Sequence, residues 1–338
     1  LSLSSVPALA ATPAATNASA ASPATVASHH AALVHANYSD TLAATQDMQS
    51  AIAAFVKAPS AEGMEAARKA WLNAREFYGQ TEAFRFYGGP IDDDNGPEGQ
   101  INAWPMDEAY VDYVQGKPKA GMVNNPKAKI TKAALIQTNE RGGEENVSTG
   151  WHTIEFLLWG QDLNGTKAGA GMRPYTDFDT ANCTGGNCER RAEYLTSAAD
   201  LLVTDLEEMV ANWGEDGEAR GNLMGTDPQL GLVAILTGLG SLSYGEVAGE
   251  RMKLGLLLHD PEEEHDCFSD NTYNSHYYDQ QGIANVYLGR YKRVDGRIVA
   301  GPSLSDVVQE KAAAPDAEMA GKTHATTEDT QHHVDCAE

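Results

Sequence analysis

His152 and Glu155 are the two side chains whose types and spacing most directly favour chemistry. They stand three residues apart in the run from Gly150 to Gly160, so on a helix both project from the same side and can contact one ligand. An imidazole combined with a carboxylate suits zinc or iron, and the remaining ligands decide between the metals. Apolar residues surround the pair, which predicts burial and a need for polar partners. A buried hydrogen bond between the two side chains, without a metal, fits the same pattern.

A second set of polar side chains follows helical spacing in residues 71–85. A solvated helix face with a weak ion pair would show this spacing. The aromatic residues around the set favour burial, so a structural role and a functional role both stay open. The members, three or four residues apart, are Arg75, Tyr78, Glu82 and Arg85.

A third set lies in the apolar segment 241–252, where Ser243, Glu246 and Glu250 are expected to share one helix face. Two carboxylates on a mostly buried helix are costly unless cations compensate them. Arg251, Lys253 or a metal ion could do so, and an internal salt-bridge network is the alternative to a ligand site.

Residues 262–272 are dense in oxygen ligands, because they include three consecutive glutamates followed by a histidine and two aspartates. Acidic loops at the surface are common in a protein of this net charge. A solvated or structural role is therefore predicted for this segment in preference to a metal site.

The elements that must position these side chains are predicted to be helices, because apolar residues recur every three or four positions and alternating β-branched runs are hard to find. Ser60 is a predicted N-cap for the helix that carries Trp71, and Gly160 ends the helix that carries His152. The glycine-rich stretch 162–187 reads as a long loop. The other predicted helices span residues 28–57, 189–213, 229–259 and 275–291.

The 338 residues carry 24 basic and 48 acidic side chains, a formal net charge of −24. A polyanion of this kind is repelled by nucleic acid and by anionic lipid, so nucleic-acid binding is excluded as a function. No nucleophile elbow, P-loop or dinucleotide fingerprint occurs. The most apolar run, from Leu230 to Tyr244, falls short of a transmembrane span, so no span is predicted.

Four cysteines bear on the compartment of the protein. Cys183 and Cys188 lie close together in a glycine-rich loop, and a disulfide is predicted there in preference to a metal site because no second pair stands nearby. A disulfide fits an oxidising compartment. A bridge between Cys267 and Cys336 is left open.

The order of these segments predicts four regions. Residues 1–27 are an export remnant or linker rich in Ala, Ser, Thr and Pro, and residues 316–338 are an acidic tail that contains histidines. Both tails are expected to be disordered or extended. Between them, residues 28–176 form an N-terminal helical bundle that carries the H-x-x-E helix, and residues 177–315 form a C-terminal helical bundle.

Together these segments resemble the imelysin-like family, in the branch of iron-regulated protein A and of proteins classed as M75 peptidases. The diagnostic G-x-H-x-x-E element of the family is matched by Gly150, His152 and Glu155. The likeness spans residues 30–300, with the two tails outside it. The further runs that resemble this branch are residues 78–90, 102–105, 243–252 and 264–272.

The resemblance implies an all-α fold of two bundle-like halves packed together, with a functional site around the motif helix. It also implies export to the periplasm or cell surface, often with a lipid anchor, and a role in iron acquisition through a metal ion, iron or zinc, or a metal chelate. The ligands predicted on this basis are His152, Glu155, Glu82 and Glu246. The residues predicted to balance the buried charge or to bind an anionic ligand are Arg75, Arg85, Ser243 and Arg251.

Two other functions are weighed against metal binding. A metallopeptidase would use His152 as a ligand and Glu155 as a ligand or as the general base for a bound water. The segment departs from the H-E-x-x-H and H-x-x-E-H motifs, because Phe156 stands where the second histidine of the latter belongs. The other function is an adaptor that only contacts an envelope or outer-membrane protein.

Overall fold

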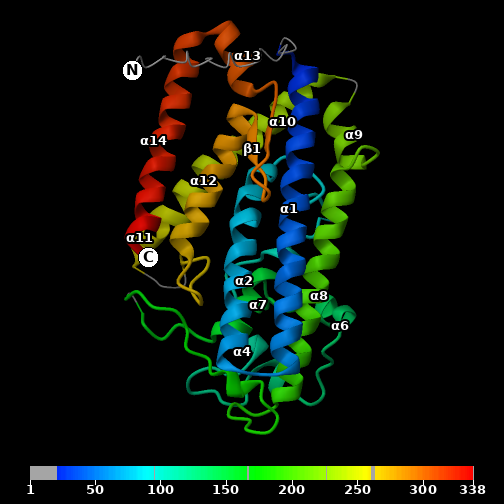
Figure 1. Ribbon diagram of the computed structural model, residues 1–338, viewed down its shortest axis with the longest axis vertical. Coiled ribbons are helices and arrows are strands. Elements are labelled where there is room, and N and C mark those ends of the chain that lie inside the picture. The colour runs from blue at the N-terminus through cyan, green and yellow to red at the C-terminus, as the bar shows by residue number, and fades with distance from the viewer. Residues whose placement is uncertain (1–20, 95, 166, 226, 260–262, 338) are drawn as a thin grey trace, which may run out of the picture.

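The computed structural model describes residues 21–94, 96–165, 167–225, 227–259 and 263–337. Its described residues are mostly helical, which confirms the all-α class. Three long helices, α1 (Pro23–Lys57), α2 (Ala61–Gly79) and α8 (Cys188–Trp213), run side by side along the long axis (Figure 1). The short helix α7 (Gly150–Trp159) packs against α2 and α8.

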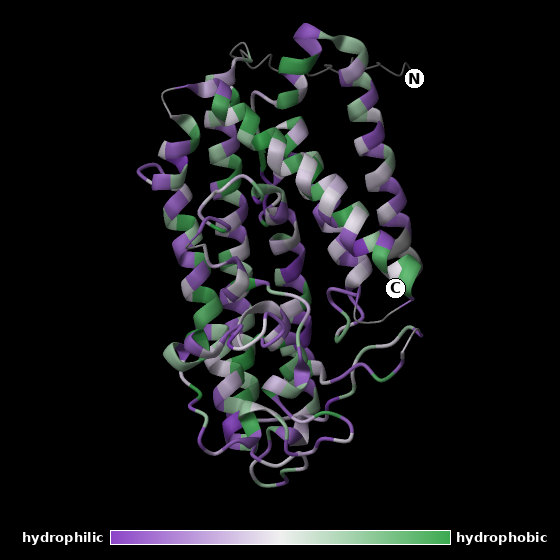
Figure 2. Cartoon of the chain, turned by 180° about the vertical axis from the view of Figure 1, so that it is seen from behind, coloured by the Kyte–Doolittle hydropathy of each residue, from purple (hydrophilic) through white to green (hydrophobic). Residues whose placement is uncertain are grey.

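Local sequence signals explain where these helices begin. Ser22 accepts a hydrogen bond from the backbone of Thr25 and caps α1, and Ser60 caps α2 through the backbone of Gly63. Hydrophobic and hydrophilic residues alternate along the long helices (Figure 2), as expected for helices with one buried face. Trp71 of α2 is fully buried, and its indole nitrogen donates to the carbonyl of Trp151 at 3.1 Å, which ties α2 to α7.

A second group of helices packs on this bundle. Helix α10 (Pro228–Gly240) continues into the π-helical segment η3 (Ser241–Lys253) and then α11 (Leu254–Leu258). Helix α12 (Thr272–Leu288) packs against α2, the 3-10 turn η1 (Gln80–Phe84) and α14 (Ala313–Ala337). The remaining short helices are α3 (Glu98–Ile101), α4 (Glu108–Val111), α5 (Gly121–Asn124), α6 (Lys132–Thr138), η2 (Tyr175–Asp177), α9 (Glu218–Met224) and α13 (Leu304–Lys311).

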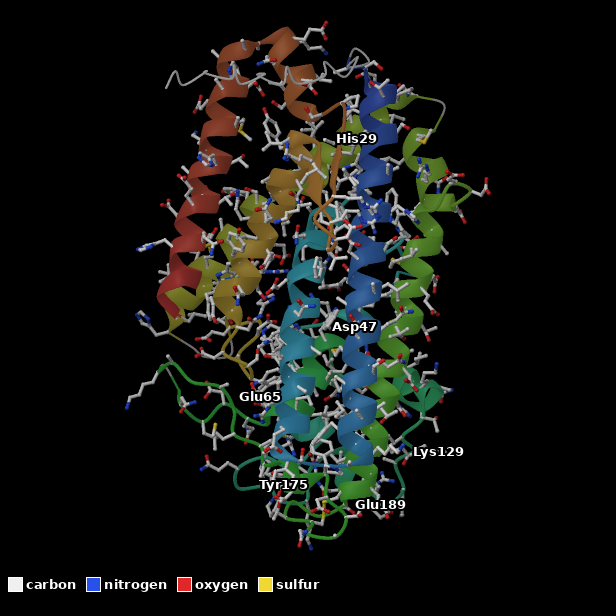
Figure 3. All side chains as sticks on the ribbon, in the orientation of Figure 1. His29, Asp47, Glu65, Lys129, Tyr175 and Glu189 are labelled. Carbon is white, nitrogen blue, oxygen red and sulfur yellow. A yellow bond between two sulfur atoms is a disulfide. The ribbon has the colours of Figure 1, made fainter. Side chains whose placement is uncertain are left out.

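A small hairpin follows α12, and the sequence did not reveal it. Strands β1 (Arg290–Lys292) and β2 (Ile298–Ala300) pair antiparallel, with Tyr291 opposite Val299. Three residues per strand are too few for an alternating pattern to emerge from the sequence. His29 of α1, labelled in Figure 3, contacts the carbonyl of Gly289 at 2.9 Å and holds the start of the hairpin against the bundle.

Both predicted tails need correction. Helix α1 begins at Pro23, so residues 23–27 are helical, while residues 1–20 lie outside the described part of the chain. Helix α14 replaces the extended C-terminal tail: Asp316 accepts hydrogen bonds from Tyr287 and Ser305. Small Ala and Thr side chains let these segments pack closely, although their sequence shows little hydrophobic periodicity.

The helix α8 comes from the predicted C-terminal half but packs lengthwise on α1. The boundaries of the two predicted halves stay predictions.

The predicted Cys183–Cys188 disulfide is confirmed. Cys267 is buried, and the side chain of Cys336 lies outside the described residues, so a Cys267–Cys336 bridge stays a prediction.

The helical run Pro228–Leu258 is long and apolar enough, by length and composition alone, to cross a membrane. The apolar run is longer than residues 230–244, because the helix continues through a second apolar stretch to Leu258, while the absence of a span stays a prediction. Core helices of soluble proteins pass the same criteria, so the run carries no argument for a membrane.

Asp205 of α8 generates a prediction about stability and pH. Burial raises the pKa of this carboxyl to about 6, while a hydrogen bond from Gln100 at 2.8 Å opposes the shift. A folded-state pKa above the ordinary value means that the fold loses stability as pH rises from about 4 to about 6. Asp205→Asn removes the titrating group and with it this loss. The free energy of unfolding of the variant minus that of wild type should therefore be ~2 kcal/mol larger at pH 7 than at pH 3.5.

Urea unfolding at several pH values measures this difference. Asp200→Asn, on the same helix, controls for the loss of one negative charge. A difference between Asp205→Asn and wild type that stays constant with pH would contradict the assignment.

Candidate metal centre

Helix α7 carries the G-x-H-x-x-E element and is buried along its whole length. The helix starts at Gly150, which has φ +81°, and a Cβ there would lie 2.3 Å from the carbonyl oxygen of Ile101. Only glycine fits this left-handed conformation and close approach. Gly160 ends the helix with φ +73°. The glycine of the motif therefore sets the position of the helix, and His152 and Glu155 supply its polar atoms.

His152 and Glu155 do lie on the same side of α7, as their spacing predicts. The Nδ1 atom of His152 is 3.2 Å from Oε2 of Glu155. A third group, Asp266, comes from the segment between α11 and α12 and places Oδ1 3.8 Å from the same nitrogen. One ligand atom from each of the three side chains lies within 4.8 Å of the others, and all three residues are buried.

Asp266 is held by three side chains, one from α2 and two from the start of α12. Arg75 of α2 forms an ion pair with it, at 2.7 Å from Nη2 to Oδ1. Asn271 donates to Oδ2 at 2.9 Å, and the hydroxyl of Ser275 donates to the same oxygen. Asn102 accepts from Arg75 at 2.7 Å and so fixes the guanidinium from its other side.

Both oxygens of Glu155 have partners. The backbone nitrogen and the hydroxyl of Ser269 donate to Oε1 at 2.8 and 2.6 Å. The other oxygen, Oε2, faces His152. The carboxylate is thus oriented with one oxygen toward the imidazole and Asp266.

The site holds one guanidinium, from Arg75, and two carboxyl groups, from Asp266 and Glu155. Burial raises the pKa of Asp266, but Arg75 and the hydrogen bonds to the carboxylate outweigh it and hold that pKa well below the usual range. Burial and the neighbouring Asp266 raise the pKa of Glu155 well above its usual range. Burial, with Arg75 next in importance, lowers the pKa of His152 to about 3, so its imidazole is neutral. Arg75 therefore balances Asp266, and Glu155 keeps its proton as long as no further cation is present.

A divalent cation fits the donor chemistry of this group, since one imidazole and two carboxylates form a mixed N/O set typical of zinc or iron. One feature that is usual for a histidine metal ligand is missing from this group. The second nitrogen of a histidine ligand normally donates to a carboxylate or carbonyl. The Nε2 atom of His152 is buried and has no hydrogen-bond partner among the described residues.

Two predicted ligands lie outside the group. Glu82 directs Oε2 to Arg251 at 2.7 Å and to Arg85 at 3.0 Å, and these contacts hold its pKa at about 2, against the effect of burial. Glu246 is partly exposed and lies 3.5 Å from Arg251. Among the described residues, the group that could hold a metal includes neither of them. Their carboxylates are compensated by arginines, which a helical spacing alone does not reveal.

Ser243 is exposed and lies apart from these contacts. Its predicted face with Glu246 and Glu250 assumed 3.6 residues per turn, but this segment is a π-helix, whose wider turn separates those positions. The three predicted arginines balance buried carboxylates. Arg75 pairs with Asp266, and Arg85 and Arg251 both pair with Glu82.

Sequence reasoning missed Asp266 as the third member of the group. The signal was the oxygen-rich segment 262–272, which was predicted to be solvated or structural; its first residue, Glu262, lies outside the described part of the chain. It also missed Asp279, which pairs with Arg251 at 2.9 Å and whose pKa burial raises to about 7.

A cavity of about 220 Å³ opens beside the site. Trp104 lines the cavity, and its ring centre lies 4.8 Å from that of His152 and 6.2 Å from that of His265, which also lines the cavity. Asn102 and Arg251 also line the cavity and belong to the polar contacts around the site. Four glutamates line it as well: Glu98, Glu140, Glu144 and Glu246.

The fold and the site define a helical-bundle protein with a buried polar centre between its helices. The family model described as Imelysin (Peptidase_M75) matches residues 34–335, so the chain belongs to the imelysin family. The match reaches beyond residue 300, where the sequence resemblance was expected to stop, and includes most of α14.

Individual relatives agree with this assignment. "Iron-regulated protein A" from Synechococcus elongatus is 28% identical over 279 residues, which cover 81% of this chain and 65% of that protein, less than two thirds of its length. A crystal structure named for an iron-regulated protein A precursor from Parabacteroides distasonis has a TM-score of 0.66 at 16% identity, covering 91% of this chain and 84% of that one. An imelysin-like protein from Psychrobacter arcticum has a TM-score of 0.56 at 15% identity, with 93% and 91% covered. These two structures bear on the fold alone.

Gly150 generates a prediction about the motif. Gly150→Ala places a methyl group against the Ile101 carbonyl in a left-handed conformation, so we expect a loss of more than ~2 kcal/mol in the free energy of unfolding. Gly240→Ala is the matched control, because that helical position is open and alanine should stabilise it by ~0.5–1 kcal/mol. Urea unfolding measures both. Equal effects of the two substitutions would refute the role given to Gly150.

Proposed function

We propose that the chain is a metal-binding imelysin that holds one divalent cation, iron or zinc, with Nδ1 of His152, Oε2 of Glu155 and Oδ1 of Asp266. The observation that carries this proposal is the convergence of these three buried side chains, whose ligand atoms lie within 4.8 Å of one another. The cation would supply Lewis acidity and positive charge at the centre of the bundle.

The protonation of Glu155 is consistent with a site that exchanges a proton for a cation. With both carboxyl groups ionised, one guanidinium would leave one negative charge uncompensated, and burial of an uncompensated charge is costly. Without a metal, Glu155 avoids this cost by keeping its proton, as the raised pKa indicates. A divalent cation makes the ionised form favourable and replaces that proton.

The adjacent cavity supports a route for a cation. Its four glutamates face two arginines, so the lining is acidic and attracts positive ions. Its volume of about 220 Å³ is small for a bulky chelate. We therefore favour a free or hydrated ion over a metal chelate at this site.

The role in iron acquisition rests on the relatives. The name of the Synechococcus protein links it to iron regulation, and we extend that link to this chain as a proposal. The Cys183–Cys188 disulfide supports a location outside the cytoplasm, in the periplasm or at the cell surface, because disulfides persist in oxidising compartments. An envelope or outer-membrane partner and a lipid anchor stay predictions.

The metallopeptidase alternative has less support. Glu155 would have to act as a base on a bound water, but one of its oxygens is occupied by Ser269 and the other faces His152. The cavity next to the site is also narrow for a peptide. We do not propose a catalytic role for Glu155.

Glu155→Gln tests the metal site with little disturbance of the fold. The amide oxygen can still accept from Ser269, and the substitution removes a carboxyl that the metal-free protein keeps protonated. We expect wild-type protein to bind about one Fe(II) or Zn(II) per chain and the variant to bind at least ~100-fold more weakly, with unfolding of the metal-free proteins unchanged.

Elemental analysis and titration of tag-free protein with Fe(II) under anaerobic conditions and with Zn(II) measure binding. Glu246→Gln is the matched control, because it also removes one carboxylate near the cavity but lies outside the group. Wild-type protein that binds neither metal, or a Glu155→Gln variant that binds as tightly as wild type, would overturn the proposal.

A further inference from the structure

A second cavity of about 530 Å³ lies between α2, α12 and the β1–β2 hairpin, which Figure 1 shows next to each other. It lies on the opposite side of α2 and α12 from the candidate metal centre. Arg75 of α2 faces Asp266, whereas the next two residues, Glu76 and Phe77, line the cavity. None of the three proposed metal ligands belongs to the lining.

The charged residues around this cavity are mostly basic, although the chain has 24 basic and 48 acidic residues. Arg290 and Lys292 lie on the same face of β1, because the intervening Tyr291 points into the core. Neither cation has an ion-pair partner within the described part of the chain. Arg293 also lines the cavity but is bound by Asp40 at 2.6 Å, and Glu76 is the one carboxylate in the lining.

A chain of side-chain amides crosses the floor of the cavity. Gln281 donates to Asn285 at 2.9 Å, Asn285 donates to Gln80 at 2.8 Å, and Gln80 donates to the backbone carbonyl of Glu76 at 3.0 Å. Each amide nitrogen has two hydrogens, and the contacts within this chain use one of them. The floor is therefore held in place and rich in hydrogen-bond donors.

Aromatic rings form a wall of the same cavity. Tyr277 and Tyr278 pack edge to face with ring centres 4.9 Å apart, and Phe77 of α2 lines the cavity with them. Tyr278 lies close against Gly79, where an added Cβ would be 3.0 Å from its own Cβ. This close approach fixes the aromatic wall against the helix.

We propose that this cavity binds a small organic anion with a planar ring, such as an aromatic carboxylate. The volume lies within the range of sites for small molecules, roughly 300–1,000 Å³. Arg290 and Lys292 bind the acidic group of the ligand through charge-assisted hydrogen bonds. The tyrosines and Phe77 contact its ring, and the amide floor donates to the oxygens of the same acidic group.

Calorimetric titration with 2-naphthoate tests the proposal. The variant Arg290→Gln/Lys292→Gln removes the two unpaired cations, which are exposed, so the fold should be unaffected. We expect it to weaken binding at least ~10-fold. The matched control, Arg297→Gln/Lys311→Gln, removes the same charge from exposed positions outside the cavity and should bind within twofold of wild type.

Two competing probes separate the parts of the proposal. The neutral analogue 2-naphthamide should bind at least ~10-fold more weakly than the carboxylate, since it lacks the charge. Inorganic phosphate should not displace 2-naphthoate at equal concentration, since it lacks the ring. Equal binding by wild type and the Arg290/Lys292 variant, tight binding of the amide, displacement by phosphate, or no binding of 2-naphthoate would each overturn the proposal.

Glu155→Gln should leave 2-naphthoate binding unchanged. The test of this cavity is therefore independent of the test of the proposed metal site.

Discussion

The ion pair between Arg75 and Asp266 joins parts of the chain that are 191 residues apart, and both side chains are almost entirely removed from solvent. Removing one partner of such a pair typically costs about 3–5 kcal/mol, because the other charge is left buried and uncompensated. Hydrogen bonds hold both partners in place: Asn102 accepts from Arg75, and Asn271 and Ser275 donate to Asp266. The pair brings Asp266 to α7, so the candidate centre depends on it.

Helices α2 and α12 present different polar side chains on their two sides. On one side, buried carboxylates are held by arginines: Arg251, for example, binds Glu82 of η1 and Asp279 of α12 together. On the other side, the helices present amides and aromatic rings to a cavity whose unpaired charges are positive. The first side is rich in carboxylates and therefore suits a cation. The second side has unpaired positive charges and therefore suits an anion.

Short-range signals in the sequence were enough to locate α2, α7 and α8, the close disulfide and the shared orientation of His152 and Glu155. N-caps, glycine stops and helical spacing act within a few residues, so they can be read locally. These local signals could not identify Asp266, the third candidate ligand. In the sequence, Glu82 and Asp266 are both acids among polar residues. Only the folded chain shows that Glu82 forms ion pairs with two arginines. The π-helical turn likewise moved Ser243 away from its expected face.

The order of the candidate ligands along the chain has a consequence for biogenesis. His152 and Glu155 are synthesised before Asp266, which follows only after the long α8 and the α10–α11 run. A growing chain, or one emerging from a translocation channel, lacks the complete donor set until the segment that carries Asp266 has returned to α7. Capture of an ion would then follow folding, and an occupied centre would mark a finished molecule.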